Sequence, residues 1–271
     1  MNTQNLIFLK LGGSLITDKT RPHTPRIDVL DRLAGEIAAA LKEAPQTSLL
    51  LGHGSGSFAH VPAKKYGTRQ GVHTKDEWRG FLEVWREAAE LDRLIVDSLT
   101  KASLPALSFP PSSMILARSG KLETWYTAPI EKALAAGLLP VVYGDVILDQ
   151  DWGGTIFSTE ELFVYLAHRL HPSRLLIAGI EPGVWADFPA CTRLIPQITP
   201  ANFEEISVQL GGSAATDVTG GMASKVQTML SLVSRIPGLQ VHVFSGLEPG
   251  NVEKTLLGKH IGTQIAANPG K

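Results

Sequence analysis

The feature that most constrains the fold of this chain is a repeated order of short apolar run, glycine-containing turn and amphipathic segment. The apolar runs occupy residues 6–9, 48–51, 138–143, 175–178 and 241–244, and glycine follows each of them. Such short, continuous apolar runs are typical of strands that are buried on both faces, as in a parallel sheet. We therefore expect strands at these positions, with glycine turns at their carboxyl ends.

Between these runs, apolar residues recur at spacings of three and four, which is the spacing of an amphipathic helix. This pattern predicts helices over residues 27–42, 78–99, 129–136, 159–169 and 221–235. Strands that alternate with helices predict an α/β fold, here a three-layer αβα sandwich with a mainly parallel central sheet. Ligands of such folds bind beyond the carboxyl ends of the strands, where the glycine turns lie.

Composition excludes several classes of protein. The chain has 271 residues, of which 44% are hydrophobic and 19% are charged, and this balance indicates a globular protein. A formal net charge of −1 argues against a nucleic-acid partner, and no apolar run approaches the roughly 20 residues that span a bilayer, which argues against a membrane partner. The one cysteine, Cys191, favours a reducing compartment, so a cytoplasmic location is expected.

The length fits one large domain or two modest ones. We expect a single domain over residues 1–271 with two lobes, 1–172 and 173–271, that meet at Pro172 and Ser173. The sequence does not define this boundary sharply, because one sheet can run through both lobes. The polar segment 148–154, which contains glycine, is expected to form a hairpin or a loop.

The first glycine turn, Lys10-Leu11-Gly12-Gly13-Ser14, combines a lysine with paired glycines and a small hydroxyl residue. Paired glycines let backbone N–H groups approach an anion closely, and the lysine adds a point charge. The spacing differs from that of a Walker A motif. A tight turn with an exposed lysine would also fit these residues.

The second turn, residues 53–60, carries small flexible residues around Ser55 and Ser57 and ends in His60. Several N–H groups of such a turn can reach one phosphate, and His60 can donate a hydrogen bond to it. The alternatives are a packing role for His60 and, less favoured, a serine nucleophile, for which the elbow pattern is missing. His53 lies beside the strand end, where it would support the turn.

The third turn, residues 216–225, opens a predicted helix and places Lys225 one turn inside it. Helix N-termini attract phosphate through their free N–H groups and their dipole. An ordinary cap at Asp217 or Thr219 with an exposed lysine would also fit. Taken together, the turns, Lys10, Lys19, Lys225 and His60 favour a site for several phosphates, as phosphoryl transfer requires.

These motifs resemble the amino acid kinase superfamily and, within it, the isopentenyl phosphate kinase family. The resemblance rests on Lys10 to Ser14, Thr17-x-Lys19, Gly56-Ser57-Phe58-Ala59-His60, Tyr143-Gly144-Asp145, the run from Asp217 to Lys225, and Gly262-Thr263-x-Ile265. It implies transfer of a phosphoryl group from ATP to isopentenyl phosphate, directly and in line, to give isopentenyl diphosphate. It also implies Mg²⁺ carried by the nucleotide phosphates, an acceptor-binding lobe 1–172, a nucleotide-binding lobe 173–271, and a homodimer.

The resemblance further implies a role for each matching residue. Lys10, Gly12, Gly13 and Ser14 would hold the β- and γ-phosphates, and Lys19 and Lys225 would neutralise the transferred group. Gly56 and Gly221 would lie on the nucleotide side. Ser55 and His60 would hold the acceptor phosphate, and the helical stripe Trp78, Phe81, Leu82 and Trp85 would be core, with part of it lining a prenyl pocket.

Two segments depart from the family pattern. Ser158-Thr159-Glu160 stands where relatives usually carry Ser-Gly-Asp, so Glu160 would orient the lysines and Thr159 would replace a glycine that faces the substrate. In residues 180–185, Ile180, Glu181 and Trp185 would take the place of the family's adenosine-binding residues. A phosphonate kinase of the fosfomycin type, a carboxylate kinase and a non-catalytic nucleotide sensor are the alternatives.

Overall fold

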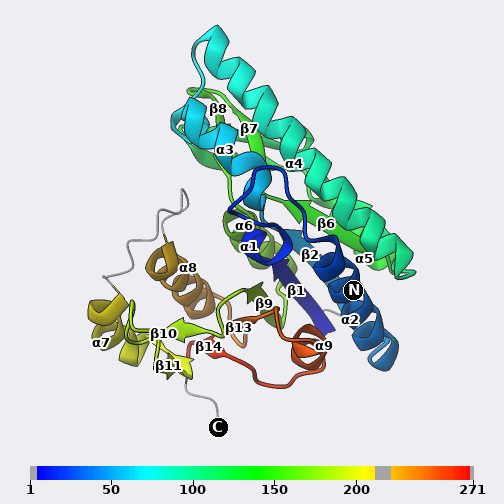
Figure 1. The fold of residues 1–271 in the computed structure, drawn as a ribbon, viewed down its shortest axis with the longest axis vertical. Coiled ribbons are helices and arrows are strands. Elements are labelled where there is room, and N and C mark those ends of the chain that lie inside the picture. Colours follow the sequence, from blue (N-terminus) through cyan, green and yellow to red (C-terminus); the bar gives the residue numbers. More distant parts are fainter. Residues whose placement is uncertain (1–4, 211–220, 269–271) are drawn as a thin grey trace.

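In the computed structural model, which describes residues 5–210 and 221–268, the central element is an eight-stranded sheet (Figure 1). Every neighbouring pair in it is parallel except β13–β14. In spatial order the strands are β12 (Gln197–Ile198), β14 (Thr263–Ala266), β13 (Gln240–Ser245), β9 (Arg174–Gly179), β1 (Leu6–Leu11), β2 (Ser48–His53), β6 (Leu139–Tyr143) and β3 (Ala106–Ser108).

Alternate residues of β1 face two separate helical layers, because successive side chains of a strand point to opposite faces. Leu6 and Phe8 pack into one core with α5 (Ala128–Ala135), α6 (Thr159–Leu170) and α8 (Gly221–Arg235). Ile7 and Leu9 pack into the other core with α1 (Gly13–Ile16), α2 (Ile27–Glu43), α4 (Lys75–Lys101) and α9 (Asn251–Leu256). The predicted αβα sandwich with a mainly parallel sheet is therefore confirmed.

The predicted strands and helices all form, with ends shifted by a few residues. The largest shift is at α4, which begins at Lys75 because Thr74 and Glu77 form a capping box. Segment 148–154 forms the predicted hairpin between β7 (Asp145–Asp149) and β8 (Gly153–Phe157). These strands belong to a second sheet with β4 (Ile115–Arg118) and β5 (Lys121–Trp125), in the order β5-β4-β7-β8.

Helix α3 (Gly56–Tyr66) forms where we expected a glycine loop. Its glycine, its serine and Pro62 are weak helix formers, so local propensity does not reveal it. Packing against α4 holds it in place: a Cβ on Gly80 would lie 2.2 Å from the ring of Tyr66, so only glycine permits this close contact. His60 therefore projects from a helix.

The remaining elements are short or lie outside the two main sheets. They are the 3₁₀ turns at Thr68–Gln70 and Pro111–Ser113, strands β10 (Val184–Trp185) and β11 (Leu194–Ile195), and helix α7 (Pro200–Leu210). Within the described part of the chain, no helix combines the length and the apolar character needed to cross a membrane.

The stripe predicted on α4 is wrong in part. Phe81 is buried, but Leu82 is 59% exposed and Trp85 is 44% exposed. The buried face of the helix instead follows Phe81, Val84 and Ala88 toward the core shared with α3 and β7. The helical repeat of about 100° per residue turns Leu82 and Trp85 away from this face.

The sheet is continuous across the expected lobe boundary. Phe8 of β1 lies in register with Leu175 of β9, and Ser173 donates its backbone N–H to the Leu6 carbonyl at 2.9 Å. The chain segments before and after Pro172 thus share one hydrogen-bonded sheet, and the division into lobes stays a prediction.

His242 on β13 makes the stability of the fold depend on pH. It is 3% exposed, and burial, with help from His260 and Arg174, lowers its pKa to about 4. The unfolded chain takes up this proton near pH 6.5 and the folded chain does not, so stability is complete above pH 6.5 and falls between pH 6.5 and 4. The loss amounts to about 3 kcal/mol. Urea unfolding of His242→Gln should show a flatter pH dependence than the parent chain, whereas exposed His168→Gln should not.

Candidate functional site

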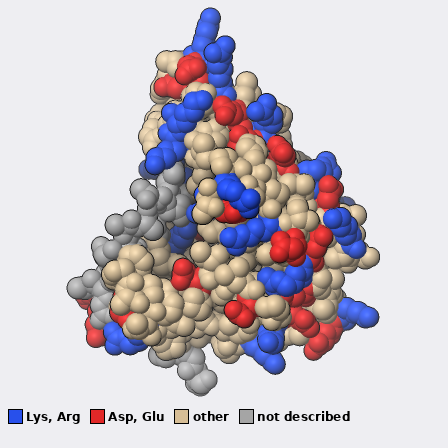
Figure 2. All heavy atoms as spheres, in the orientation of Figure 1, with Lys and Arg blue, Asp and Glu red and all other residues tan. Residues whose placement is uncertain are grey.

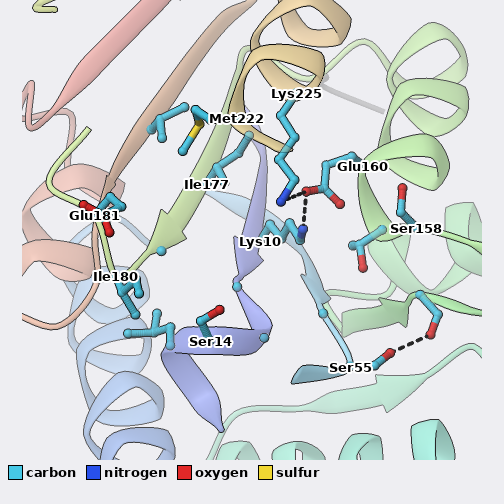
Figure 3. A pocket seen from close by; sticks show the side chains of 18 of the residues that line it. Lys10, Ser14, Ser55, Ser158, Glu160, Ile177, Ile180, Glu181, Met222 and Lys225 are labelled. Carbon is cyan, nitrogen blue, oxygen red and sulfur yellow. Dashed lines mark hydrogen bonds and ion pairs between the residues drawn. The ribbon is translucent and has the colours of Figure 1, made fainter. Parts of the chain in front are cut away.

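A cavity of about 380 Å³ lies beyond the carboxyl ends of the central strands (Figure 3). Its walls include the ends of β1, β8 and β9, the turn that follows β2, and parts of helices α1, α3, α6 and α8. This is the edge at which the glycine turns were expected to gather. The position follows from the topology, since parallel strands bring their carboxyl ends to the same edge of a sheet.

A buried charge cluster occupies the middle of the cavity. Lys10 at the end of β1 forms an ion pair with Glu160 on α6, and the Nζ atom of Lys225 on α8 lies 3.8 Å from the same carboxylate oxygen. Figure 3 shows both lysine side chains pointing toward Glu160. Burial raises the pKa of Glu160, but Lys10 and Lys225 outweigh it and hold that pKa below its usual value. Glu160 is therefore an anion at neutral pH.

The local sequence explains why Glu160 lies there. Ser158 caps α6 by accepting the backbone N–H of Glu161, and Glu161 returns a hydrogen bond to the backbone of Ser158. This capping box starts the helix so that Glu160 occupies its second position, where the helix dipole favours a carboxylate.

Thr159, which departs from the family pattern together with Glu160, turns its side chain away from the cavity centre. It is 1% exposed, and its hydroxyl donates to the His53 carbonyl at 2.6 Å. A Cβ on Gly52 would lie 2.6 Å from the Thr159 methyl group, so the bare backbone of Gly52 makes room for this methyl. The threonine is accommodated without closing the cavity.

The first two glycine turns pack backbone against backbone. A Cβ on Gly13 would lie 2.4 Å from the Gly56 nitrogen, and one on Gly54 would lie 2.9 Å from the Gly13 nitrogen. Gly56 has a φ of +52° and faces Thr17, whose hydroxyl oxygen would lie 2.0 Å from an added Cβ. Gly56 thus lies behind the cavity wall, while Gly12, Gly13 and Ser14 line the cavity.

One end of the cavity combines polar groups with a small apolar wall. Ser55 and His60 line it from the start of α3, and the Ser55 hydroxyl donates to the Gly144 carbonyl at 3.2 Å. The apolar wall belongs to the core between α3 and α4 and consists of Ala59, Ala63, Val84 and Ile156. Of helix α4, it is Val84 that lines the cavity; Trp78, Phe81, Leu82 and Trp85 are not among the lining residues.

The opposite end is wider and more apolar. It belongs to the core beneath α8, and its wall is formed by Ile177, Met222, Val226, Met229, Val243 and Ile265. At its rim the Trp185 indole donates to a Glu181 carboxylate oxygen at 2.8 Å, with Ile180 beside them. Figure 3 shows Ile180, Glu181 and Met222 on one side of the charge cluster and Ser55 and Ser158 on the other.

The structure brings most of the sequence-predicted site residues into one cavity. Those that line it are Lys10, Gly12, Gly13, Ser14, Lys19, Ser55, His60, Thr159, Glu160, Ile180, Trp185 and Lys225. Gly221 begins α8, and residues 216–220 lie outside the described residues.

Sequence reasoning missed Arg69. It lines the cavity from a 3₁₀ turn, donates to the Ile156 carbonyl at 3.2 Å and pairs with Glu161 at 2.8 Å. No local pattern marks it, because its partners lie far along the chain.

The chain is similar in sequence and fold to known proteins. Residues 5–245 match the model of the amino acid kinase family. The isopentenyl phosphate kinase of Methanocaldococcus jannaschii is 34% identical over 269 residues, which cover 96% of this chain and 98% of that protein. The corresponding protein of Haloferax volcanii is 35% identical over 261 residues, with the same coverage. An X-ray structure of an isopentenyl phosphate kinase aligns with a TM-score of 0.81 and 29% identity, over 97% of this chain and 100% of that one.

The charge cluster predicts a response to anions. Glu160→Gln removes the carboxylate between Lys10 and Lys225, so we expect a loss of about 2 kcal/mol in the free energy of unfolding. Pyrophosphate should restore more stability to this variant than it adds to the parent chain, because it replaces the missing negative charge. Thermal unfolding with and without pyrophosphate measures both effects. Glu123→Gln, at a surface pair with Arg118, is the control, and equal stability and anion response in Glu160→Gln would contradict the prediction.

Proposed function

The chain belongs to the amino acid kinase family, and on that premise we propose that it phosphorylates isopentenyl phosphate with ATP to give isopentenyl diphosphate. The observation that carries this proposal is the Lys10–Glu160–Lys225 cluster between two unlike cavity ends. One end pairs Ser55 and His60 with a short apolar wall, and the other offers a wide apolar surface. The isopentenyl phosphate kinases that cover nearly all of this chain support the same substrate.

The first end suits a prenyl phosphate. Ser55 and His60 can donate hydrogen bonds to the acceptor phosphate, while Ala63, Val84 and Ile156 offer a dry surface for a short hydrocarbon tail. A purely polar acceptor would leave this wall without a partner. The wall thus favours an acceptor with a hydrocarbon tail over a polar phosphonate.

The reaction needs positioning and positive charge rather than a covalent intermediate. An oxygen of the acceptor phosphate attacks the γ-phosphorus of ATP, the bond from that phosphorus to the bridging oxygen breaks, and ADP leaves with the electron pair. Lys10, Lys19 and Lys225 stabilise the charge that spreads over the transferred group. Glu160 holds Lys10 and Lys225 in place so that they act on one point.

The second end suits the nucleotide. The backbone N–H groups of Gly13 and Ser14 would contact its phosphates, beside Gly12, whose own N–H donates to the Ala178 carbonyl at 2.8 Å. Gly56 would support this turn from behind, and Gly221 would open the helix that carries Lys225. The apolar surface beneath α8 would receive the base, and Ile180, Glu181 and Trp185 would contact it at the rim. In this arrangement residues 1–172 form an acceptor-binding lobe and residues 173–271 a nucleotide-binding lobe.

The chemistry also calls for Mg²⁺, which neutralises phosphate charge when bound with ATP. In the described part of the chain, no group of three or more potential ligand side chains lies together. Glu160 is engaged by Lys10 and Lys225. The donor set therefore fits a metal held mainly by phosphate oxygens and water. The cytoplasmic location inferred from the single cysteine stays a prediction.

Acceptor-dependent ADP release tests the proposed function. We expect ADP from ATP and Mg²⁺ when isopentenyl phosphate is added, and little with ATP alone. Lys225→Ala should lower kcat at least about 100-fold through lost charge stabilisation. His60→Ala should lower kcat/KM for the acceptor by a similar factor, with the KM for ATP little changed.

The controls separate these effects from damage to the fold. Arg235→Ala lies on the same helix as Lys225, and His73→Ala replaces an exposed histidine; both should behave like the parent chain. Binding of ATP without acceptor-dependent ADP release would indicate a sensor, and turnover of fosfomycin in place of isopentenyl phosphate would indicate a phosphonate kinase.

We further propose a homodimer through the surface of α4, β3 and β7, which carries four exposed large hydrophobic side chains. Leu82 and Trp85 lie on α4, Leu107 lies on β3 and Leu148 lies on β7, and each is at least 44% exposed. Helix α4 packs against both of these strands. Figure 2 shows basic and acidic side chains intermixed over much of the face it presents.

Light scattering should give twice the chain mass of 29.2 kDa. The double variant Trp85→Glu and Leu148→Glu should shift the mass toward the monomer, because charge on both elements opposes burial of this face. Val61→Glu, at a 54% exposed position on α3, is the control and should leave the mass unchanged. A parent chain at 29.2 kDa would contradict the dimer.

A further inference from the structure

His53 is a fully buried histidine that the proposed chemistry does not use. It ends strand β2, one residue before the turn that carries Ser55, and it is 0% exposed. It is not among the residues that line the cavity. Burying an imidazole costs free energy unless its ring nitrogens are hydrogen-bonded, so the contacts of His53 need a physical reason.

The backbone of His53 joins the segments that line the acceptor end. Its carbonyl accepts the Thr159 hydroxyl at 2.6 Å and the Gly144 N–H at 3.4 Å. Thr159 precedes Glu160, and Gly144 in turn accepts the Ser55 hydroxyl at 3.2 Å. The relative positions of Ser55 and Glu160 thus depend on where the His53 backbone lies.

The side chain of His53 is held from three directions. Its Nε2 atom lies 3.2 Å from an oxygen of Asp92 on α4, and its Nδ1 atom lies 3.3 Å from the Gly54 carbonyl. Its ring stacks on Tyr143 with a centroid distance of 5.1 Å and an interplanar angle of 17°. Each ring nitrogen therefore lies within hydrogen-bond distance of an oxygen atom, which fixes the orientation of the ring.

Asp92 is fixed in turn. It is 6% exposed, and its second carboxylate oxygen accepts the Ser108 hydroxyl from β3 at 2.6 Å. A buried carboxylate with satisfied partners is rigid, because each alternative position would leave a charge without a partner. The chain from Ser108 through Asp92 to His53 therefore ties β2 to α4 and β3.

We propose that His53 and Asp92 are positioning residues that set Ser55 against Glu160, and so fix the place where the acceptor phosphate is held. This inference rests on the proposed function. It predicts that the pair acts more on acceptor binding than on nucleotide binding, because the apolar surface proposed for the base belongs to the separate core beneath α8. Loosening the pair would misplace the acceptor phosphate while ATP still binds.

Steady-state kinetics of Asp92→Asn and His53→Gln test the proposal. We expect the KM for isopentenyl phosphate to rise about tenfold or more in each, with the KM for ATP changing less than about threefold. The double variant should be little worse than either single variant, since each breaks the same contact. Calorimetric titration with isopentenyl phosphate should show the same weakening as the KM.

The matched control is His242→Gln, which removes another buried histidine from the same sheet outside the cavity. A merely structural role for His53 would lower stability and the active fraction, hence kcat, in the same way as this control, without shifting the KM for the acceptor. If Asp92→Asn fails to fold, Ser108→Ala tests the proposal in its place. This variant removes only the hydrogen bond from Ser108 to Asp92 and should raise the KM for isopentenyl phosphate by a smaller factor.

The outcomes separate this proposal from the function on which it rests. No acceptor-dependent ADP release by the parent chain would overturn the proposed function. Normal turnover by the parent, together with unchanged acceptor KM in folded His53→Gln, Asp92→Asn and Ser108→Ala, would overturn the positioning role alone. Equal increases in the KM values for acceptor and ATP would also overturn it, because the effect would then not be confined to the acceptor end.

Discussion

The arrangement of the site depends on one electrostatic constraint: two ammonium groups must share a small, poorly hydrated space. Lys10 comes from strand β1 and Lys225 from helix α8, and without a carboxylate between them their repulsion would push β1 and α8 apart. Glu160 meets this need from the first turn of α6, a position that the helix dipole also stabilises. The same carboxylate that permits the lysines to approach each other also aims them at one point.

A second constraint is the close approach of backbones around this cluster. Gly13, Gly54 and Gly56 touch along their main chains, and Gly52 leaves space for the Thr159 methyl group. Even a methyl side chain at one of these glycines would clash with the neighbouring turn. The turns would then have to move apart, and the cavity between them would open. The high glycine content thus has two uses, one for N–H groups that face the cavity and one for packing behind it.

Much of the fold could be predicted because β1 and its neighbours are buried on both faces and therefore carry continuous apolar runs. Helix α3 could not, since it contains Gly56 and Pro62 and is stabilised by the contact between Tyr66 and Gly80. The lysines were evident because Lys10 adjoins the first glycine turn, Lys19 follows that turn, and Lys225 follows Gly220 and Gly221 in the sequence. Val84 and Arg69 were not, because the core between α3 and α4 brings them to the cavity from positions with no local signal.

The replacement of an expected Gly-Asp by Thr159-Glu160 shows how such a site tolerates change. The longer Glu160 side chain still reaches both lysines. The Thr159 side chain is buried away from the cavity centre, where its hydroxyl donates to the His53 carbonyl. That bond links the charge cluster to a buried network that reaches α4 through Asp92. The threonine that replaces the expected glycine thus adds a hydrogen bond between the end of β2, next to the Ser55 turn, and the residue before Glu160, which orients the lysines.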